Sequence, residues 1–162
     1  MCGIAGHFGA PRTAALRGRM RAALLHRGPD AQHDAAFAQD GTRLPDAAHA
    51  AVGLVHTRLS IIDPRPLADQ PMPSDDGRVW ICYNGEVYGW QAAARELESA
   101  GARFRTWCAT EFILRGYEAW GIEALLPRLR GMFAFAIVDF RTGKAHVVRD
   151  WLGLKPVVYP HD

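Results

Sequence analysis

The sequence predicts an α+β domain in which antiparallel sheets are covered by helices. Three observations favour this class: the predicted strands outnumber the predicted helices, the helices gather in the middle of the chain, and residues 141–144 have the composition of a hairpin turn. A doubly wound parallel sheet would instead need strands that alternate with helices. With 162 residues, 49% of them hydrophobic, the chain suits a single domain, 1–162, with a substantial core.

The N-terminal half is predicted to contain one helix among several short strands. Residues 3–8 read as a strand, and a helix follows Pro11, which suits a first helical turn, and runs to about residue 25. Gly28-Pro29 then breaks any helix and places 26–30 in a loop. Further on, we expect a surface loop at 39–50 and strand segments at 35–39, 52–54 and 59–62.

The second half opens with a long irregular stretch that begins at Pro64 and Pro66 and reaches Gly77. Loops of that length usually serve a site. The strand at 132–139 is apolar on both faces, which predicts burial between two layers. The other expected elements are strands at 79–83 and 145–148 and helices at 90–100, 110–120 and 122–129, the first two helices closed by Gly101 and Gly121.

Composition excludes several classes of protein. The net charge is only +2, and an arginine-rich stretch reads as one solvated helix face rather than a nucleic-acid patch: Arg12, Arg17, Arg19 and Arg21. No signal segment and no apolar run of membrane-spanning length occurs. Three cysteines and seven histidines lack the spacing of a metal site, and the odd cysteine count favours a reducing compartment. The sequence thus predicts a cytoplasmic protein with no nucleic-acid or membrane partner, and no metal.

Cys2 is the first candidate for chemistry. Once Met1 is removed, a cysteine at this position carries a thiol nucleophile and a free α-amino group, and these two groups titrate close to each other near neutral pH. With Met1 retained, that nitrogen is an amide and the base is lost. The more common explanation for such a cysteine is that it is incidental, at the start of a buried strand.

Three other segments complete a candidate amide-cleaving site. The Asn84 side-chain amide and the Gly85 backbone N–H can converge on one oxyanion, although Asn-Gly is more often a turn dipeptide. Arg58, beside a predicted strand, can bind a carboxylate through two parallel hydrogen bonds. An exposed arginine at a strand end is equally consistent with the spacing. Arg27, in the loop 26–30, is ambiguous in the same way.

Taken in order, these segments resemble the glutaminase domain of class II glutamine amidotransferases, and in particular the N-terminal half of glutamine-hydrolysing asparagine synthetases. The similarity extends from residue 1 to about Tyr159. Each string is short, but the ordered set is specific: Met1-Cys2-Gly3-Ile4-Ala5-Gly6, His26-Arg27-Gly28-Pro29-Asp30, His56-Thr57-Arg58-Leu59-Ser60-Ile61-Ile62-Asp63, Gln70-Pro71-Met72, Tyr83-Asn84-Gly85-Glu86-Val87-Tyr88, Arg130-Gly131-Met132-Phe133-Ala134-Phe135-Ala136, and Arg149-Asp150 with Gly153-Leu154-Lys155-Pro156.

The resemblance implies an N-terminal-nucleophile hydrolase fold, a four-layer αββα sandwich of antiparallel sheets that here lacks its C-terminal strands. It also implies that Cys2 attacks the side-chain amide of glutamine to form a glutamyl thioester, releasing ammonia and then glutamate. By the same resemblance Asn84 and Gly85 form the oxyanion hole. The resemblance also implies substrate binding by Arg58, to the α-carboxylate, by Glu86 and by Arg27. Arg27 and Asp30 would in addition shape the nucleophile's pocket.

One departure from the family pattern concerns the substrate. Members of the family usually carry Ser-Asp-Thr-Glu at the start of a helix, whereas this chain has Cys108-Ala109-Thr110-Glu111. The family's aspartate pairs with the α-ammonium of glutamine, and Ala109 cannot. Glu111 is a poor substitute, because two residues along a helix turn a side chain by about 200°. We therefore expect weakened glutamine binding; the alternatives are an amide substrate lacking an α-amino group and a non-catalytic module that binds a partner or a small ligand.

A second departure concerns the synthetase half of the family. Its Ser-Gly-Gly-x-Asp-Ser pyrophosphate loop does not occur in this chain. ATP and Mg²⁺ would belong to that absent domain, so no cofactor is expected here, and the expected partners are glutamine and a synthetase domain or subunit that accepts ammonia. The missing strands would leave a sheet edge open, which predicts pairing at that edge, including a homo-oligomer.

Overall fold

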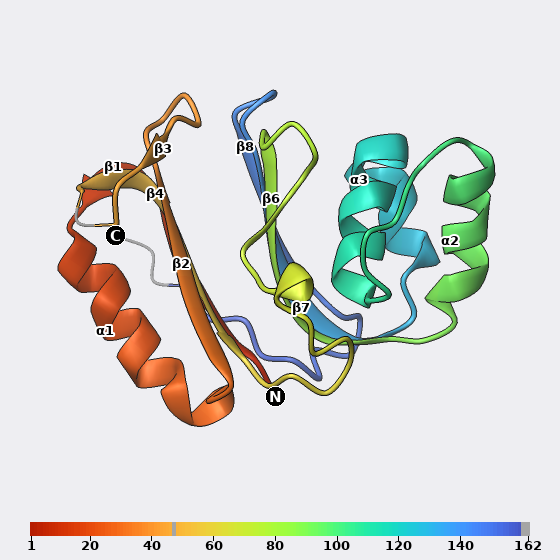
Figure 1. Cartoon of the computed structure of the whole chain (residues 1–162), viewed down its shortest axis with the longest axis horizontal. Coiled ribbons are helices and arrows are strands. Elements are labelled where there is room, and N and C mark those ends of the chain that lie inside the picture. Colours follow the sequence, from red (N-terminus) through yellow and green to blue (C-terminus); the bar gives the residue numbers. More distant parts are fainter. Residues whose placement is uncertain (47, 160–162) are drawn as a thin grey trace.

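The protein folds into four layers, with helices on the outer faces of two antiparallel sheets (Figure 1). The computed structural model describes residues 1–46 and 48–159. Helix α1 (Ala14–Leu24) covers the outer face of one sheet, and helices α2 (Trp90–Ser99) and α3 (Ala109–Leu125) cover the outer face of the other (Figure 1). This αββα arrangement confirms the predicted fold class.

The first sheet has the strand order β1-β4-β2-β3. Its strands are β1 (Gly3–Arg12), β4 (Ala50–Arg58), β2 (Ala31–Phe37) and the two-residue β3 (Arg43–Leu44). Every residue of β4 is buried, because β1 and β2 flank it in the sheet while α1 and the second sheet cover its faces. The short 3₁₀ helix η1 (Leu25–Arg27) joins α1 to the loop before β2.

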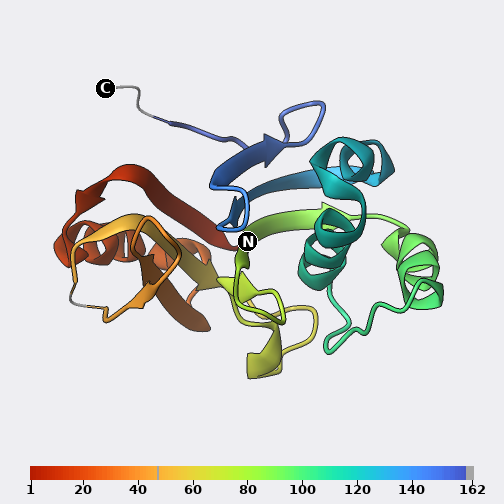
Figure 2. The ribbon, with the colours of Figure 1, turned by 90° about the horizontal axis from the view of Figure 1, so that it is seen from above.

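The second sheet has the order β5-β6-β7-β8, and β8 is an edge strand. Its strands are β5 (Met72–Pro73), β6 (Val79–Val87), β7 (Gly131–Asp139) and β8 (Lys144–Arg149). The 3₁₀ helices η2 (Pro66–Ala68) and η3 (Leu126–Arg128) lie in the connections before β5 and β7. The N-terminus lies between the two sheets (Figure 2), so the start of β1 reaches the second sheet.

Two apolar cores hold the layers together. The larger one packs β6 and β7 against α2 and α3, with Phe112, Leu114, Phe135 and Ile137 almost inaccessible to solvent. The smaller one joins the inner faces of the two sheets: Ala35, Phe37, Val52, Leu54, Cys82, Val138 and Phe140. The apolar pattern of 132–139 therefore predicted its burial between layers correctly. In the described part of the chain, no helix is long and apolar enough to cross a membrane.

The structure corrects the predicted strand at 59–62. Strand β4 ends at Arg58, and the chain turns there because the Arg58 guanidinium gathers the backbone carbonyl groups of Ile62, Asp63 and Arg65. A buried cation with its hydrogen bonds satisfied by the next few carbonyls is incompatible with an extended continuation. The apolar pair at 61–62 is instead exposed.

Two predictions about the first helix are also wrong. Pro11 belongs to β1, and the helix begins only at Ala14. The arginine stretch is not one solvated face, because Arg17 is 1% exposed and its Nε donates to an Asp34 carboxylate oxygen at 3.1 Å. An aliphatic stem and a paired head allow an arginine to lie against the sheet.

The remaining differences concern element boundaries. Strand β2 begins at Ala31, earlier than predicted, and the expected loop at 39–50 contains β3. Gly121, with a φ of 74°, interrupts α3 where the sequence predicted an end, but the helix resumes as far as Leu125.

Candidate active site

A cavity of about 260 Å³ opens at the N-terminus and collects most of the predicted site residues. Residues from several separate parts of the chain line it, among them the start of the chain, the end of β4, residues 83–86 of β6 and the start of α3. Their sequence separation is large, yet β1 pairs with β4 in the first sheet and the second sheet supplies the other wall. The volume suits a ligand smaller than the drug-sized molecules that fill typical pockets of about 300–1,000 Å³.

Cys2 lies in this cavity, held from two sides. The backbone N–H of Leu59 donates to the Cys2 Sγ at 3.5 Å, and Arg27 Nε donates to the Cys2 carbonyl oxygen at 3.1 Å. Arg27 does not itself line the cavity. Asp30 accepts a hydrogen bond from the backbone N–H of Ser60 at 2.7 Å, beside Leu59. The loop 26–30 thus supports Cys2 and its neighbouring backbone at Ser60.

Gly28 explains why this loop lies so close to β4. A Cβ atom at Gly28 would be 2.3 Å from the carbonyl oxygen of Thr57. Only a residue without a side chain fits there, and this close approach puts Arg27 within reach of Cys2.

Asn84 and Gly85 line the cavity opposite the first sheet, from within β6. They pair with Ala134 and Phe133 of β7, so the interpretation of Asn-Gly as a simple turn is wrong. Gly85 has a φ of 155°, and a Cβ there would be 2.2 Å from the carbonyl oxygen of Met132. Glycine is therefore required at this point of the strand, and it leaves the cavity side open to a ligand.

Arg58 lines the cavity but is already well satisfied by the protein. It is 5% exposed, its Nη1 donates to Asp69 Oδ1 at 2.5 Å and to the Arg65 carbonyl oxygen at 3.1 Å, and its Nη2 donates to the carbonyl oxygens of Ile62 and Asp63. The interpretation as an exposed strand-end arginine is wrong. Binding a substrate carboxylate would require Arg58 to exchange some of these partners.

The opposite side of the cavity carries one free carboxylate. Glu86 is partly buried, and within the described residues its carboxylate makes no hydrogen bond or ion pair. Ala109, at the first position of α3, also lines the cavity and presents a methyl group. The position where the family pattern has an aspartate thus faces the cavity, and it is apolar here.

Glu111 does not line the cavity, in agreement with the helical-wheel expectation. It is fully buried, and its carboxylate accepts hydrogen bonds from the backbone N–H groups of Arg105 and Thr106, at 3.0 and 2.6 Å, and from Arg115 Nη2 at 3.3 Å. These contacts fix the segment that leads into the cavity-lining end of α3.

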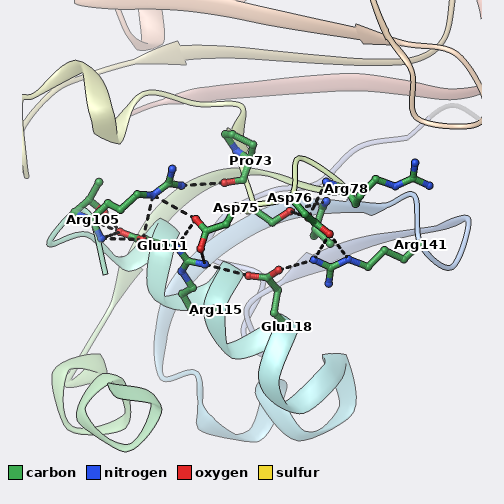
Figure 3. A network of polar contacts seen from close by, with 12 residues as sticks. Pro73, Asp75, Asp76, Arg78, Arg105, Glu111, Arg115, Glu118 and Arg141 are labelled. Atoms are coloured by element: carbon green, nitrogen blue, oxygen red, sulfur yellow. Dashed lines mark hydrogen bonds and ion pairs between the residues drawn. The ribbon is translucent and has the colours of Figure 1, made fainter. Parts of the chain in front are cut away.

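Glu111 is one end of a larger polar network (Figure 3). Arg115 forms a two-pronged pair with Asp75, at 2.7 and 2.8 Å, and Arg141 joins Asp76 to Glu118, both at 2.8 Å. The turn before β6, helix α3 and the β7–β8 hairpin are thereby tied together outside the cavity. The network is structural, and it holds α3 against the sheet that carries Asn84.

Gln70, Tyr83 and Lys155 are among the cavity residues that received no role from the sequence. Gln70 bridges two walls, since its Oε1 accepts from the Tyr83 backbone N–H at 2.5 Å and its Nε2 donates to Thr110 Oγ1 at 3.1 Å. Tyr83 has a buried hydroxyl group with no hydrogen-bond partner among the described residues, and burial, followed by the nearby Glu86 charge, raises its pKa. All three lie in the quoted motifs, but only the fold shows that they share one cavity.

The fold and the site together define the class of protein: an antiparallel αββα sandwich with a cysteine at the head of the first strand is an N-terminal-nucleophile hydrolase fold. Among solved structures, glutamine phosphoribosylpyrophosphate (PRPP) amidotransferase from B. subtilis is similar with a TM-score of 0.72 at 17% identity, covering 93% of this chain and 37% of that chain. The allosteric regulatory enzyme of purine biosynthesis gives a TM-score of 0.70 over 85% of this chain and 35% of its own, also at 17% identity. At such identities the likeness concerns the fold.

The family is given by the sequence comparisons. A glutamine amidotransferase domain model matches residues 1–162, and the chain belongs to this family. Asparagine synthetase [glutamine-hydrolyzing] 1 of Bacillus subtilis is 35% identical over 165 residues, which cover 98% of this chain and 24% of that relative. Asparagine synthetase [glutamine-hydrolyzing] 3 of Arabidopsis thaliana is 34% identical over 161 residues, 97% of this chain and 25% of its own length. The chain spans about a quarter of the length of these relatives.

Proposed function

We propose that this chain hydrolyses the side-chain amide of glutamine to glutamate and ammonia through a thioester on Cys2. The observation that carries the proposal is the convergence of Cys2, Arg58, Asn84 and Gly85 on one cavity from segments far apart in the sequence. Each residue alone has a common structural explanation. Their convergence supplies a nucleophile, a cation and oxyanion donors within the reach of one small substrate.

The reaction begins when Met1 has been removed and the Cys2 nitrogen is a free amine. This amine takes the thiol proton, and the sulfur attacks the amide carbon of the substrate. The resulting oxyanion accepts hydrogen bonds from the Asn84 side-chain amide and the Gly85 backbone N–H. The C–N bond then breaks, the departing nitrogen takes the proton held by the amine, and ammonia leaves a glutamyl thioester.

Water completes the cycle. The free α-amine of Cys2 takes a proton from a water molecule that attacks the thioester carbon, the C–S bond breaks, and the sulfur leaves as a thiol with that proton. The Leu59 N–H that lies 3.5 Å from the sulfur stabilises negative charge on it in both half-reactions.

Arg58 and Glu86 bind the two charged groups at the far end of the substrate. Arg58 supplies the cation for the α-carboxylate after exchanging some of its contacts with the carbonyl groups around it, while Glu86 supplies a free anion for the α-ammonium. With alanine at 109, Glu86 is the anion left for that ammonium among the described residues lining the cavity. We therefore propose an active enzyme with weakened affinity for glutamine.

The ammonia would serve a synthetase domain or subunit of the asparagine-synthetase kind. This step rests on the relatives, which are named as glutamine-hydrolysing asparagine synthetases and of which the chain spans about a quarter. ATP and Mg²⁺ would act in that partner, not in the cavity described above.

Two measurements test the proposal. Glutamate release from glutamine is followed with the purified chain, and intact mass is recorded before and after incubation with 6-diazo-5-oxo-norleucine, a glutamine-like electrophile. We expect a chain without Met1, turnover, and a single adduct on Cys2. A chain that keeps Met1, or one without Met1 that forms no adduct, would favour the non-catalytic module instead.

A further inference from the structure

Lys155 reaches the cavity because of a tight turn after β8. The Asp150 carboxylate accepts hydrogen bonds from the backbone N–H groups of Leu152, Leu154 and Lys155, the last two at 2.9 Å, and from Phe133 of β7 at 3.2 Å. Asp150 is itself 3% exposed. The turn is therefore anchored to β7, next to the strand that carries Asn84 and Gly85, and it directs the Lys155 side chain toward the N-terminus.

The environment of the Lys155 ammonium group is unusual. The residue is 6% exposed and lines the same cavity as Cys2. Within residues 1–46 and 48–159, the only hydrogen-bond partner of its Nζ is the Met1 sulfur, at 2.7 Å. A thioether is a weak acceptor, so this buried cation has no anionic partner while Met1 is present.

Removal of Met1 takes away that one hydrogen bond and vacates space in the cavity next to the Cys2 nitrogen, to which Met1 is bonded. A buried ammonium group without a partner is costly, and it becomes favourable when an anion forms next to it. The other charged or titratable groups on the cavity wall are Arg58, Glu86, Tyr83 and Cys108. Arg58 is paired with Asp69, and Glu86 is an anion that opposes negative charge on sulfur.

We infer that Lys155 is a positioning residue for the nucleophile, whose ammonium group stabilises the thiolate of Cys2 in the chain from which Met1 has been removed. The inference rests on the proposed function for the identity of the nucleophile. The cation would hold negative charge on the sulfur and would disfavour protonation of the α-amine beside it, so that the amine is free to accept the thiol proton. Neither effect requires contact with the substrate.

The test is the pH dependence of Cys2 alkylation by iodoacetamide, a neutral reagent, measured without substrate. Rates are read from the mass of the N-terminal peptide, so Cys82 and Cys108 do not contribute. The variants are Lys155→Met, which keeps the length and removes the charge, Lys155→Arg, which keeps the charge, and Lys144→Met, a matched loss of charge at the exposed lysine that starts β8.

We expect Lys155→Met to move the pH of half-maximal alkylation upward by about one unit or more, because loss of a nearby opposite charge raises the pKa of a thiol. Lys155→Arg and Lys144→Met should stay near the original value. Far-ultraviolet circular dichroism checks folding, and Lys155→Gln replaces the methionine variant if that one does not fold.

If the folded Lys155→Met variant keeps the original pH of half-maximal alkylation, the inference is overturned. This includes the case in which only the KM for glutamine rises, which would make Lys155 a ligand of the substrate carboxylate. An equal shift in Lys144→Met would also overturn it, because the effect would then be one of net charge. Alkylation needs no turnover. A chain that releases no glutamate, and so fails the proposed function, still reports whether Lys155 acts on the sulfur.

Discussion

The two ends of the cavity differ in how far their residues match the family pattern. At the end that we propose holds the nucleophile, Cys2, Asn84 and Gly85 match the family pattern, and Cys2 accepts hydrogen bonds from Arg27 and Leu59. At the opposite end, the first turn of α3 presents the methyl group of Ala109 where the pattern has a carboxylate. In the proposed reaction, the first end performs bond cleavage, whereas the second distinguishes one amide from another.

This difference predicts separate effects on the two kinetic constants of an enzyme, kcat and KM. Groups that act on the developing oxyanion determine kcat, while groups that hold the substrate equally in the ground state and the transition state determine KM. The cavity therefore predicts an enzyme that retains its catalytic groups but has a weak affinity for glutamine. Substitutions at each end test this separation.

Cys2→Ala should have the largest effect. Removing the nucleophile abolishes the thioester route, and glutamate release should fall by about 10⁴-fold or more. Cys82→Ala is the matched control, because Cys82 is buried between the sheets and burial raises its pKa, which keeps it protonated. Turnover that survives in Cys2→Ala, measured by release of glutamate, would show that the cavity is not where the amide is cleaved.

Asn84→Ala should come next. Loss of one oxyanion donor lowers kcat by about 10²- to 10³-fold, with little change in KM. Steady-state kinetics with glutamine provide both constants. If KM rises while kcat holds, Asn84 binds the ground state, and the nucleophile end is not specialised for the transition state.

Ala109→Asp tests the other end of the cavity. The new carboxylate faces the cavity and pairs with the α-ammonium of glutamine, and a charge-assisted hydrogen bond of about 1.5–3 kcal/mol lowers KM by roughly 10- to 100-fold or more. The isosteric Ala109→Asn is the control for shape. An amide substrate without an α-amino group should gain nothing from either variant. If Ala109→Asp binds glutamine no better than the original chain, ammonium pairing is not what limits affinity.

The difference between the two ends also shows what the sequence could predict. The nucleophile end consists of short contiguous strings, and the pattern around Cys2 and Asn84 predicted it without knowledge of the fold. The missing aspartate was equally visible, because Ala109 stands beside Thr110-Glu111 in an otherwise familiar segment. The helical period alone placed Glu111 away from the substrate, and its burial outside the cavity agrees.

The sequence did not predict features that depend on long-range contacts. The strands predicted at 52–54 and 59–62 left out residues 56–58, but the structure buries all three in β4, where the Thr57 hydroxyl donates to the Leu24 carbonyl oxygen at 3.0 Å. Arg17 looked solvated because its partner, Asp34, lies in a different element. Lys155 received no role, since its place beside Met1 depends on a contact across nearly the whole chain.

The smallest expected effect concerns the stability of the sheet beneath the nucleophile. His56 pairs with Ile4 across β4 and β1, two residues along from Cys2, and it is fully buried. Burial lowers its pKa to about 4, with the Arg58 charge adding to the effect. In the unfolded chain the pKa returns to about 6.5, so between these values the unfolded state binds more protons and folding stability falls as the pH falls.

From pH 7.5 to pH 5 this histidine should reduce the free energy of unfolding by about 2 kcal/mol, measured by urea denaturation at each pH. His7, whose pKa burial also lowers, contributes in the same direction and remains in the variant. His56→Asn should therefore flatten the pH dependence without abolishing it, while His49→Asn, at an exposed site, should leave it unchanged. An equal slope in His56→Asn would mean that His56 is not held neutral by the fold. In that case, the pH dependence of stability would have to come from other groups, His7 among them.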